Sequence, residues 1–205
     1  MNKIVIGVDE VGAGPLAGPL CVCAAAIDEG KIRVEGVTDS KKLTPIKREI
    51  LFPLIEESII GRSIIWIEPH EVDEINIYEA RRKAMALAID ELLEKLNKLN
   101  YRGEEIEVKV DGGNLHLKTK NDLQIEYIIK GDEREYAIGC ASIIAKVERD
   151  RLMIGLADEY VQYGFERHKG YGTKEHIKAI REFGLCGIHR KSFCRKFMKG
   201  KNIRA

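Results

Sequence analysis

Three apolar segments, far apart in the sequence, each lead into an acidic residue. They are residues 3–8 before Asp9 and Glu10, residues 105–110 before Asp111, and residues 123–129 before Asp132. Their β-branched side chains favour strands, and active sites in α/β sheets form beyond the carboxyl ends of parallel strands. Acids that converge there repel one another, so such a cluster either takes up protons or binds hard cations such as Mg²⁺ or Mn²⁺. The pattern predicts an α/β protein with a carboxylate site where its strands end.

Strand and helix patterns alternate along the chain. Further strands are expected at residues 20–27, 32–37 and 63–68, and helices at residues 45–61, 77–99, 136–160 and 173–183. The first two of these strands flank a tight turn at residues 28–31, which predicts a hairpin. The connection at residues 112–122 is short for a parallel crossover. Either an extended loop crosses there, or Asp132 reaches the cluster from the start of the following helix.

The composition is that of a globular chain. Of its 205 residues, 44% are hydrophobic and 33% are charged, which supplies a sizeable core and excludes disordered and coiled-coil classes. No apolar run approaches the roughly 20 residues of a membrane helix, and the first residues resemble a strand rather than a signal peptide. We therefore expect a cytoplasmic monomer that does not associate with membranes. Residues 1–160 should form its main domain, and residues 161–205 a C-terminal helical extension with a basic tail.

The cysteines favour packing over disulfide or metal roles. There are five of them, an odd number, which does not suggest a disulfide framework. Cys21 and Cys23 share one face of an expected strand and should be buried thiols. The spacing typical of zinc ligands is absent from the other candidates, which are His176, Cys186, His189 and Cys194.

Three loops and the C-terminal tail suit a phosphate or a sugar. The glycines around Ala13 let backbone N–H groups approach a ligand oxygen. Ser40 and Lys41 can offer a hydroxyl and a cation to a phosphate, or form a capped turn before the next helix. Tyr171 stands between two glycines, close to Lys169, and can stack on a sugar or base. Residues 183–205 contain several basic residues and no acid, which suggests an anionic partner or a solvated tail.

Seven sequence blocks follow one another over nearly the whole chain. They are DEVGAGPLAGP, DSKKL, VDGGN, KGD, ASIIAKVERDR, HKGYGT and HRKSF. With these blocks, residues 4–193 closely resemble ribonuclease HII, the prokaryotic type 2 ribonuclease H. The resemblance implies an α/β, RNase H-like fold, in which a mixed five- or six-stranded sheet is flanked by helices and followed by a C-terminal helical extension.

The same resemblance implies a chemistry. The catalytic and metal-binding acids of the family match Asp9, Glu10, Asp111 and Asp132, which are the four residues that the strand ends select. Two Mg²⁺ or Mn²⁺ ions would activate water and stabilise the leaving oxygen. The implied reaction is cleavage of RNA within RNA/DNA hybrids, and incision on the 5′ side of a single ribonucleotide in duplex DNA. Its products carry 3′-hydroxyl and 5′-phosphate ends.

The resemblance assigns recognition of the 2′-hydroxyl to a Gly-Arg-Gly loop and a tyrosine, which match Gly12, Ala13, Gly14 and Tyr171. This chain departs from the pattern because Ala13 stands where the family has arginine. A charge-assisted phosphate contact worth about 1.5–3 kcal/mol would be lost. We therefore expect retained ribose recognition with weaker or altered binding at the RNA–DNA junction. Further candidate phosphate contacts are Ser40, Lys41, Lys169 and the basic tail.

Two other interpretations stay open at this point. One is another two-metal nuclease of the same fold, which would cut without a 2′-hydroxyl, and the other is a catalytically silent hybrid-binding protein, which Ala13 would favour. A glycosidase that uses Asp9 and Glu10 is disfavoured, because adjacent strand residues point to opposite faces. The expected partners are RNA/DNA hybrids and DNA duplexes that contain ribonucleotides. The tail is too polar for a typical clamp-binding peptide, so no clamp is expected.

Overall fold

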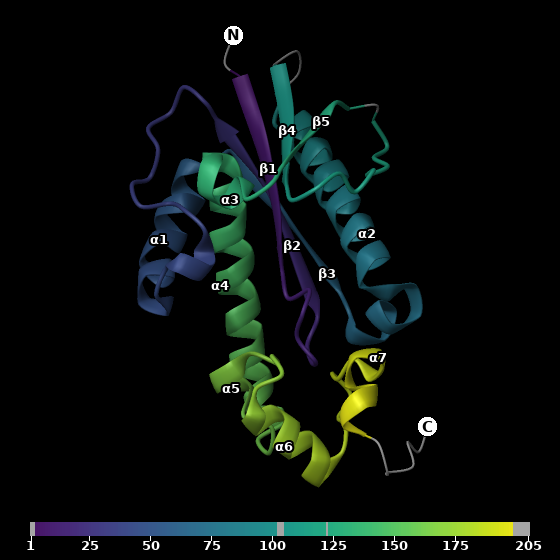
Figure 1. Cartoon of the computed structure of the whole chain (residues 1–205). Coiled ribbons are helices and arrows are strands. Elements are labelled where there is room, and N and C mark those ends of the chain that lie inside the picture. Colours follow the sequence, from purple (N-terminus) through teal and green to yellow (C-terminus); the bar gives the residue numbers. More distant parts are fainter. Residues whose placement is uncertain (1–2, 102–104, 122, 199–205) are drawn as a thin grey trace. The chain divides into compact units, whose positions relative to one another are not determined.

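One mixed sheet organises the first part of the chain. The computed structural model describes residues 3–101, 105–121 and 123–198. Within them, five strands join in the order β3-β2-β1-β4-β5 (Figure 1). The strands are β1 Lys3–Val11, β2 Leu20–Asp28, β3 Gly61–Ile67, β4 Glu105–Asp111 and β5 Ile125–Ile128. β1 pairs antiparallel with β2 and parallel with β4, and β4 pairs parallel with β5, so the expected mixed sheet is confirmed.

The helices largely follow the sequence pattern. The 3-10 helices are η1 Ser40–Lys42 and η2 Arg195–Phe197, and the α-helices are α1 Pro45–Ser58, α2 Pro69–Lys98, α3 Gly131–Arg134, α4 Tyr136–Glu159, α5 Phe165–His168, α6 Lys174–Phe183 and α7 Lys191–Cys194. Thr44 and Thr173 cap α1 and α6, where each hydroxyl accepts the backbone N–H three residues further on. The short helices α3, α5 and α7 were not expected from the sequence.

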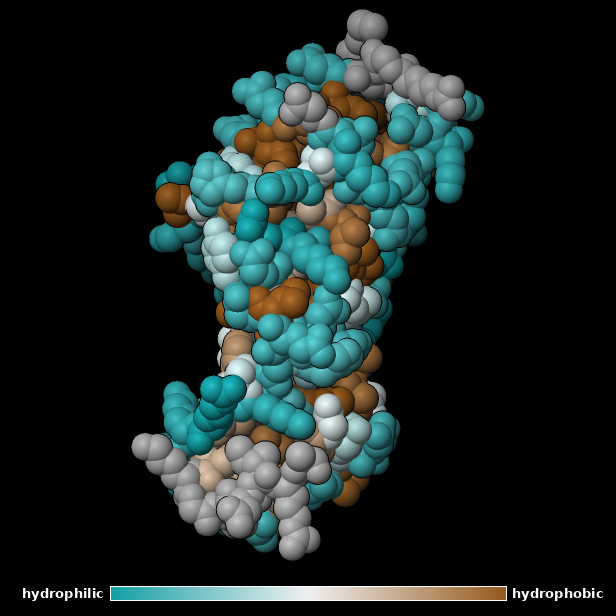
Figure 2. All heavy atoms as spheres, turned by 90° about the vertical axis from the view of Figure 1, so that its right-hand side faces the viewer, coloured by the Kyte–Doolittle hydropathy of each residue, from teal (hydrophilic) through white to brown (hydrophobic). Residues whose placement is uncertain are grey.

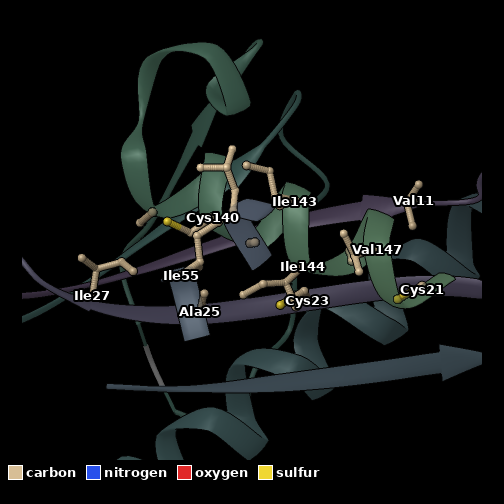
Figure 3. Close-up of a cluster of buried hydrophobic side chains, with 14 of the residues drawn as sticks. Val11, Cys21, Cys23, Ala25, Ile27, Ile55, Cys140, Ile143, Ile144 and Val147 are labelled. Carbon is tan, nitrogen blue, oxygen red and sulfur yellow. The ribbon is translucent and has the colours of Figure 1, made fainter. Parts of the chain in front are cut away.

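Helices α1 and α4 cover one face of the sheet. Their apolar side chains pack with the odd-numbered residues of β1 and β2 in a buried cluster that includes Val11, Ile55 and Ile144 (Figure 3). Cys21 and Cys23 are fully buried in this cluster, which confirms their core role, and burial raises the pKa of the Cys23 thiol. Figure 1 shows α2 on the opposite side of the sheet. The even-numbered residues of β1 point to that side, because side chains alternate along a strand.

Residues 32–37 do not form the expected hairpin strand. β2 already has β1 along one edge and β3 along the other, so neither edge is open to a further strand. The segment runs instead as a loop, in which Ile32 is 95% exposed and Val34 N donates to the Tyr136 hydroxyl at 2.8 Å. The β-branched composition of this segment could not reveal the error, because a strand distant in sequence occupies its pairing edge.

Helix α2 begins earlier than the expected start at residue 77. The backbone of Asn76, with φ 65° and ψ 163°, interrupts the helix. The Asn76 side-chain oxygen accepts the N–H groups of Tyr78 and Glu79 at 2.9 and 3.2 Å. Asn76 therefore caps the helix that the sequence predicts, and residues 69–75 form a separate helical segment before it.

The chain divides into two compact units, and the division differs from the expected one at residue 160. The first unit contains Met1–Val11, Cys21–Trp66 and Arg81–Val147, and the second contains Gly12–Leu20, Ile67–Ala80 and Glu148–Ala205. The second unit has its own core, in which Leu16, Tyr163 and Phe165 are buried. It includes the loop after β1 because Leu16 accepts the backbone N–H of Arg190 at 2.8 Å.

The face of the molecule drawn in Figure 2 is mainly hydrophilic, with separate hydrophobic patches. Large apolar side chains are exposed at positions such as Ile32, Ile46 and Val161. Scattered exposure of this kind is usual for globular proteins. Among the described residues, no helix combines the length and the apolar character that crossing a bilayer requires.

Candidate active site

The pairing of β1 with β4 brings two of the predicted acids together. Val8 pairs with Val110 in parallel register, so Asp9 and Asp111 follow side by side at the same end of the two strands. β1 runs on past its acids, because Asp9 and Glu10 still pair with β2. The expectation that this strand stops before its acids is therefore wrong, although both acids lie close to its carboxyl end.

Asp132 reaches the same region from the short helix α3. A loop links β4 to β5, and β5 is shorter than the strand expected at residues 123–129. The chain then turns at Lys130, whose backbone is in the left-handed conformation with φ 57°. The Gly131 N–H donates to Asp111 Oδ1 at 2.7 Å, which fixes the start of α3 to the end of β4. Both alternatives for this connection therefore hold: an extended loop joins two parallel strands, and the acid stands at the start of a helix.

Asp9 and Glu10 point to opposite faces of the sheet, because neighbouring side chains alternate along a strand. On the α4 side, Asp9 is 4% exposed and hydrogen-bonds Ser142 of α4. On the α2 side, Glu10 Oε1 lies 2.7 Å from Nη2 of Arg81. The register with β4 directs Asp111 to the Asp9 side. The cluster thus has aspartates on one side of β1 and a glutamate, paired with arginine, on the other.

Burial, and then repulsion between neighbouring carboxylates, raises the pKa of three of the four acids. Burial, and then repulsion from Glu10 and Asp111, raises the pKa of Asp9 well above its ordinary value. Burial and repulsion from neighbouring acids, Asp111 first, raise the pKa of Asp132 to about 6. Burial also raises the pKa of Glu10, against the opposing attraction of Arg81. A cation placed among these groups would remove the repulsion and favour their charged forms.

Lys41 of η1 supplies positive charge to this cluster. Burial alone would lower its pKa, but attraction to the surrounding aspartates, Asp9 first, raises it. Asp39 caps η1 and accepts the Lys41 backbone N–H at 2.8 Å. Ser40 is 2% exposed, and its hydroxyl lies 2.9 Å from the Ser142 hydroxyl. Lys41 is therefore available beside the acids, whereas the Ser40 hydroxyl is engaged inside the protein.

The acids suit divalent cations by their chemistry, although they do not form a closed metal site in this arrangement. Within the described ranges, no three His, Cys, Asp or Glu side chains are positioned to hold one ion. Glu10 Oε2 is buried and has no hydrogen-bond partner among these residues, which leaves an acceptor that a cation would satisfy. Carboxylate oxygens are the ligands that Mg²⁺ and Mn²⁺ prefer. The four acids therefore suit such ions by their chemistry, and an ion that binds Glu10 would replace its present partner, Arg81.

In the second unit, two buried arginines hold the loop that contains Gly12, Ala13 and Gly14. Arg190 donates to the carbonyls of Gly12 and Ala13 at 2.7 and 3.0 Å. Arg149 donates to two carbonyls further along the same loop at 2.9 and 3.2 Å. Gly12 has φ +88°, and a Cβ there would lie 2.2 Å from Arg149 Nε, whereas nothing lies within 4 Å of a Cβ at Gly14. The loop therefore requires glycine at position 12 for its own structure.

The two arginines also place positive charge behind this loop. Both side chains are fully buried, and Arg190 donates further to the Gly18 carbonyl at 2.8 Å. Burial, and next the charge of Arg149, lowers the pKa of Arg190 to about 10. The two guanidinium groups therefore add positive charge next to the loop, which favours an anionic ligand such as a phosphate.

A chain of hydrogen bonds holds the backbone at Tyr171. The Cys186 N–H donates to His189 Nδ1 at 2.9 Å, and His189 Nε2 lies 3.0 Å from His176 Nε2. His176 Nδ1 lies 2.9 Å from the Tyr171 carbonyl oxygen. Neutral rings satisfy the whole chain when His189 is protonated on Nε2 and His176 on Nδ1, a tautomer choice inferred from the partners. Three of the four residues considered as zinc ligands thus order the Tyr171 loop, whereas the Cys194 thiol donates to the Leu16 carbonyl.

Tyr171 and Lys169 differ in how free they are to meet a substrate. Tyr171 is 39% exposed, and the Arg149 guanidinium lies 6.0 Å from its ring centroid. Lys169 has a left-handed backbone, with φ 51°, and its ammonium donates to the Glu166 carbonyl. Both residues belong to the second unit with the glycine loop, whereas the acids, Ser40 and Lys41 belong to the first. The substrate contacts of these residues remain predictions.

Several important side chains had no role in the sequence interpretation. Ser142, Arg149 and Arg190 lie within the recognised blocks, which marked their segments but not their contacts, and Arg190 was also counted in the basic tail, although it is fully buried. Arg81 lies in a helix with many charged residues, where an arginine normally indicates a solvated face. Their positions inside the blocks are a sequence signal for these three residues, whereas Arg81 is revealed only by its contact with Glu10.

The mixed sheet flanked by helices, with acids at the carboxyl ends of its parallel pair, belongs to the class of RNase H-like nucleases. The family model for ribonuclease HII matches residues 6–196. The ribonuclease HII of Caldicellulosiruptor saccharolyticus is 46% identical over 197 residues, which cover 96% of this chain and 90% of that relative. The chain belongs to the ribonuclease HII family.

Solved structures agree with this assignment. The ribonuclease H2 from Pyrococcus horikoshii has a TM-score of 0.76 and 28% identity, and the match covers 95% of this chain and 97% of that one. A Bst-RNase HIII in complex with Mn²⁺ shares the fold, with a TM-score of 0.69, 20% identity, and coverage of 96% of this chain and 69% of that one. The resemblance, the RNase H-like fold and the enzyme class are confirmed: the protein is a ribonuclease H, an endonuclease that hydrolyses RNA in RNA/DNA hybrids.

The buried histidines predict a loss of stability in mild acid. Burial lowers the pKa of His176 to about 4, and burial followed by the nearby His176 lowers the pKa of His189 to about 3. Histidine in an unfolded chain titrates near about 6.5. As the pH falls below that value, the unfolded state binds protons that the folded state does not. Stability therefore declines from pH 6.5 towards the folded-state pKa values.

We expect each of these histidines to reduce the free energy of unfolding by about 2 kcal/mol between pH 7.5 and pH 5. Urea titrations across that range measure the change. His189→Gln should flatten the pH dependence, and His70→Gln, at an exposed position of α2, should retain it. A wild-type urea midpoint that does not move with pH contradicts the proposed burial of neutral histidines.

Proposed function

We propose that this ribonuclease H uses two divalent metal ions held by Asp9, Glu10, Asp111 and Asp132. The observation that carries the proposal is the convergence of Asp9, Asp111 and Asp132, where burial and then repulsion from neighbouring acids raise the pKa of Asp9 and Asp132. In addition to cutting hybrids, we propose incision on the 5′ side of a single ribonucleotide in duplex DNA, with 3′-hydroxyl and 5′-phosphate products. The cation in the cell is Mg²⁺ or Mn²⁺.

In the first unit, the acidic residues would bind the metal ions and the basic residue Lys41 would bind the substrate. Divalent ions bound by the carboxylates supply activation of the attacking water and stabilisation of the leaving oxygen. Lys41 is exposed beside the aspartates and is suited to bind a phosphate of the substrate. Ser142 and the Gly131 N–H hold Asp9 and Asp111 in place, which keeps these carboxylates from turning away.

Recognition of the ribose would come from the second unit. Ordered backbone at Gly12, Ala13 and Gly14 can approach the 2′-hydroxyl and the adjacent phosphate, and the half-exposed ring of Tyr171 can stack on a sugar. The buried arginines Arg149 and Arg190 support this assignment, because they fix the loop backbone and add positive charge behind it. The proposed partners are RNA/DNA hybrids and DNA duplexes with embedded ribonucleotides, bound by a cytoplasmic monomer.

Cleavage of three matched duplexes tests the proposed function. The substrates are DNA with one ribonucleotide, an all-RNA/DNA hybrid and an all-DNA control, each with Mg²⁺ or Mn²⁺. We expect cutting on the 5′ side of the ribonucleotide and none of the all-DNA duplex. Asp111→Asn should reduce kcat by about a hundredfold or more, because it removes a charged ligand of the ions that would stabilise the transition state. Asp158→Asn, at an exposed acid of α4, should not.

The outcomes separate the alternatives. Cutting of the all-DNA duplex would indicate a nuclease of the same fold that does not sense ribose. Hybrid cleavage without incision at a single ribonucleotide would retain the hydrolytic chemistry and contradict the proposed junction recognition. A folded protein that binds hybrid but cuts none of the duplexes would be a silent binding protein.

Restoring the family arginine tests the role of the glycine loop. Ala13 is half-buried, and its carbonyl is held by Arg190. Ala13→Arg should add a charge-assisted phosphate contact and raise kcat/KM on the single-ribonucleotide duplex by about tenfold or more. Ala13→Met supplies a side chain of similar length without charge and should not raise it. Equal kcat/KM for the wild type and Ala13→Arg would count against a phosphate contact at this position.

A further inference from the structure

The ion pair between Glu10 and Arg81 is incomplete on both sides. Glu10 Oε1 lies 2.7 Å from Arg81 Nη2, and the two side chains are 13% and 26% exposed. In the described part of the chain, neither Glu10 Oε2 nor Arg81 Nε has a hydrogen-bond partner, although both atoms are buried. Buried groups of this kind are usually fully paired. The pair therefore leaves a carboxylate oxygen and a guanidinium donor free to take a further ligand.

Arg81 stands close to the end of β4 as well. A Cβ on Gly112, the residue after Asp111, would lie 3.9 Å from Arg81 Nη2. The guanidinium thus contacts Glu10 and lies near the backbone that follows Asp111. On the other face of β1, the positive charge of Lys41 is attracted to the aspartates, Asp9 first. Each face of the acid cluster therefore has a cation of the protein's own.

We propose that Arg81 is the internal counter-cation of Glu10 and competes with a divalent metal ion for that carboxylate. This inference rests on the proposed metal-dependent function. An ion that binds Glu10 must displace a charge-assisted hydrogen bond, so Arg81 weakens the affinity for that ion. The same contact orients Glu10 before the ion arrives, which makes Arg81 a positioning residue. The other acids are not paired with Arg81 and should be affected less.

Removal of the competitor should tighten metal binding. We expect Arg81→Ala to lower the dissociation constant of one Mn²⁺ ion by about tenfold to a hundredfold, the range that corresponds to loss of one charge-assisted hydrogen bond. Arg81→Gln, which keeps donors but loses the charge, should give a smaller change in the same direction. Arg82→Ala is the matched control, because it removes the same formal charge from the neighbouring residue. The guanidinium of Arg82 donates to the His116 carbonyl at 2.9 Å.

The measurement is electron paramagnetic resonance of free Mn²⁺ in titrations of the whole protein without substrate. Circular dichroism establishes that each variant is folded. In a Glu10→Gln background, Arg81→Ala should no longer change Mn²⁺ affinity, because the contested carboxylate is gone. This comparison separates direct competition from a general effect of charge.

Three results would overturn the inference. The first is unchanged or weaker Mn²⁺ binding by folded Arg81→Ala, and the second is equal tightening by Arg82→Ala. Both leave the proposed function intact as long as the wild type binds Mn²⁺. The third is the absence of Mn²⁺ binding in every folded variant and in the wild type, which would contradict the metal-dependent function and the inference with it.

Discussion

The parallel pairing of β1 with β4 is the constraint on which the candidate site depends. Because Val8 pairs with Val110, the next residues, Asp9 and Asp111, lie side by side on neighbouring strands. The Gly131 N–H donates to the Asp111 carboxylate and so holds the segment of Asp132 next to it. The sheet thereby concentrates negative charge in a poorly hydrated place, at a cost in folding free energy. Sites that keep such a cost usually serve function, and a bound cation would repay it.

The second unit has the opposite charge arrangement. Arg149 and Arg190 are fully buried, and backbone carbonyls of the loop after β1 accept their hydrogen bonds. Histidines do the same for the loop of Tyr171, which His176 holds through its carbonyl. Burial of these charged and polar side chains would be unfavourable without partners, and the backbone carbonyl groups of the loops supply the hydrogen bonds. The same hydrogen bonds hold the loop backbone in place. Both loops are thus prepared before a substrate arrives.

The sequence predicted that Asp9 and Asp111 lie together, because acids near the carboxyl ends of parallel strands share one region. The sequence prediction was wrong where strand pairing between distant segments determines the structure. Residues 32–37 have the composition of a strand, but β3 occupies the edge of β2 with which they would have to pair. The sequence could not predict the Glu10–Arg81 contact, which requires knowing that α2 covers the even-numbered face of β1. The seven blocks predicted the family, and the contacts of Arg149 became visible only in the folded chain.

The most direct test of the central claim is the thermal stability of Asp111→Asn with and without Mg²⁺. Asparagine keeps the oxygen that accepts the Gly131 N–H but removes one charge from the cluster. If carboxylate repulsion is the defining feature of this site, the variant melts at a higher temperature than the wild type without Mg²⁺. Added Mg²⁺ should then stabilise the wild type and not the variant. A variant that melts lower without Mg²⁺, or gains as much from Mg²⁺ as the wild type does, would contradict the account.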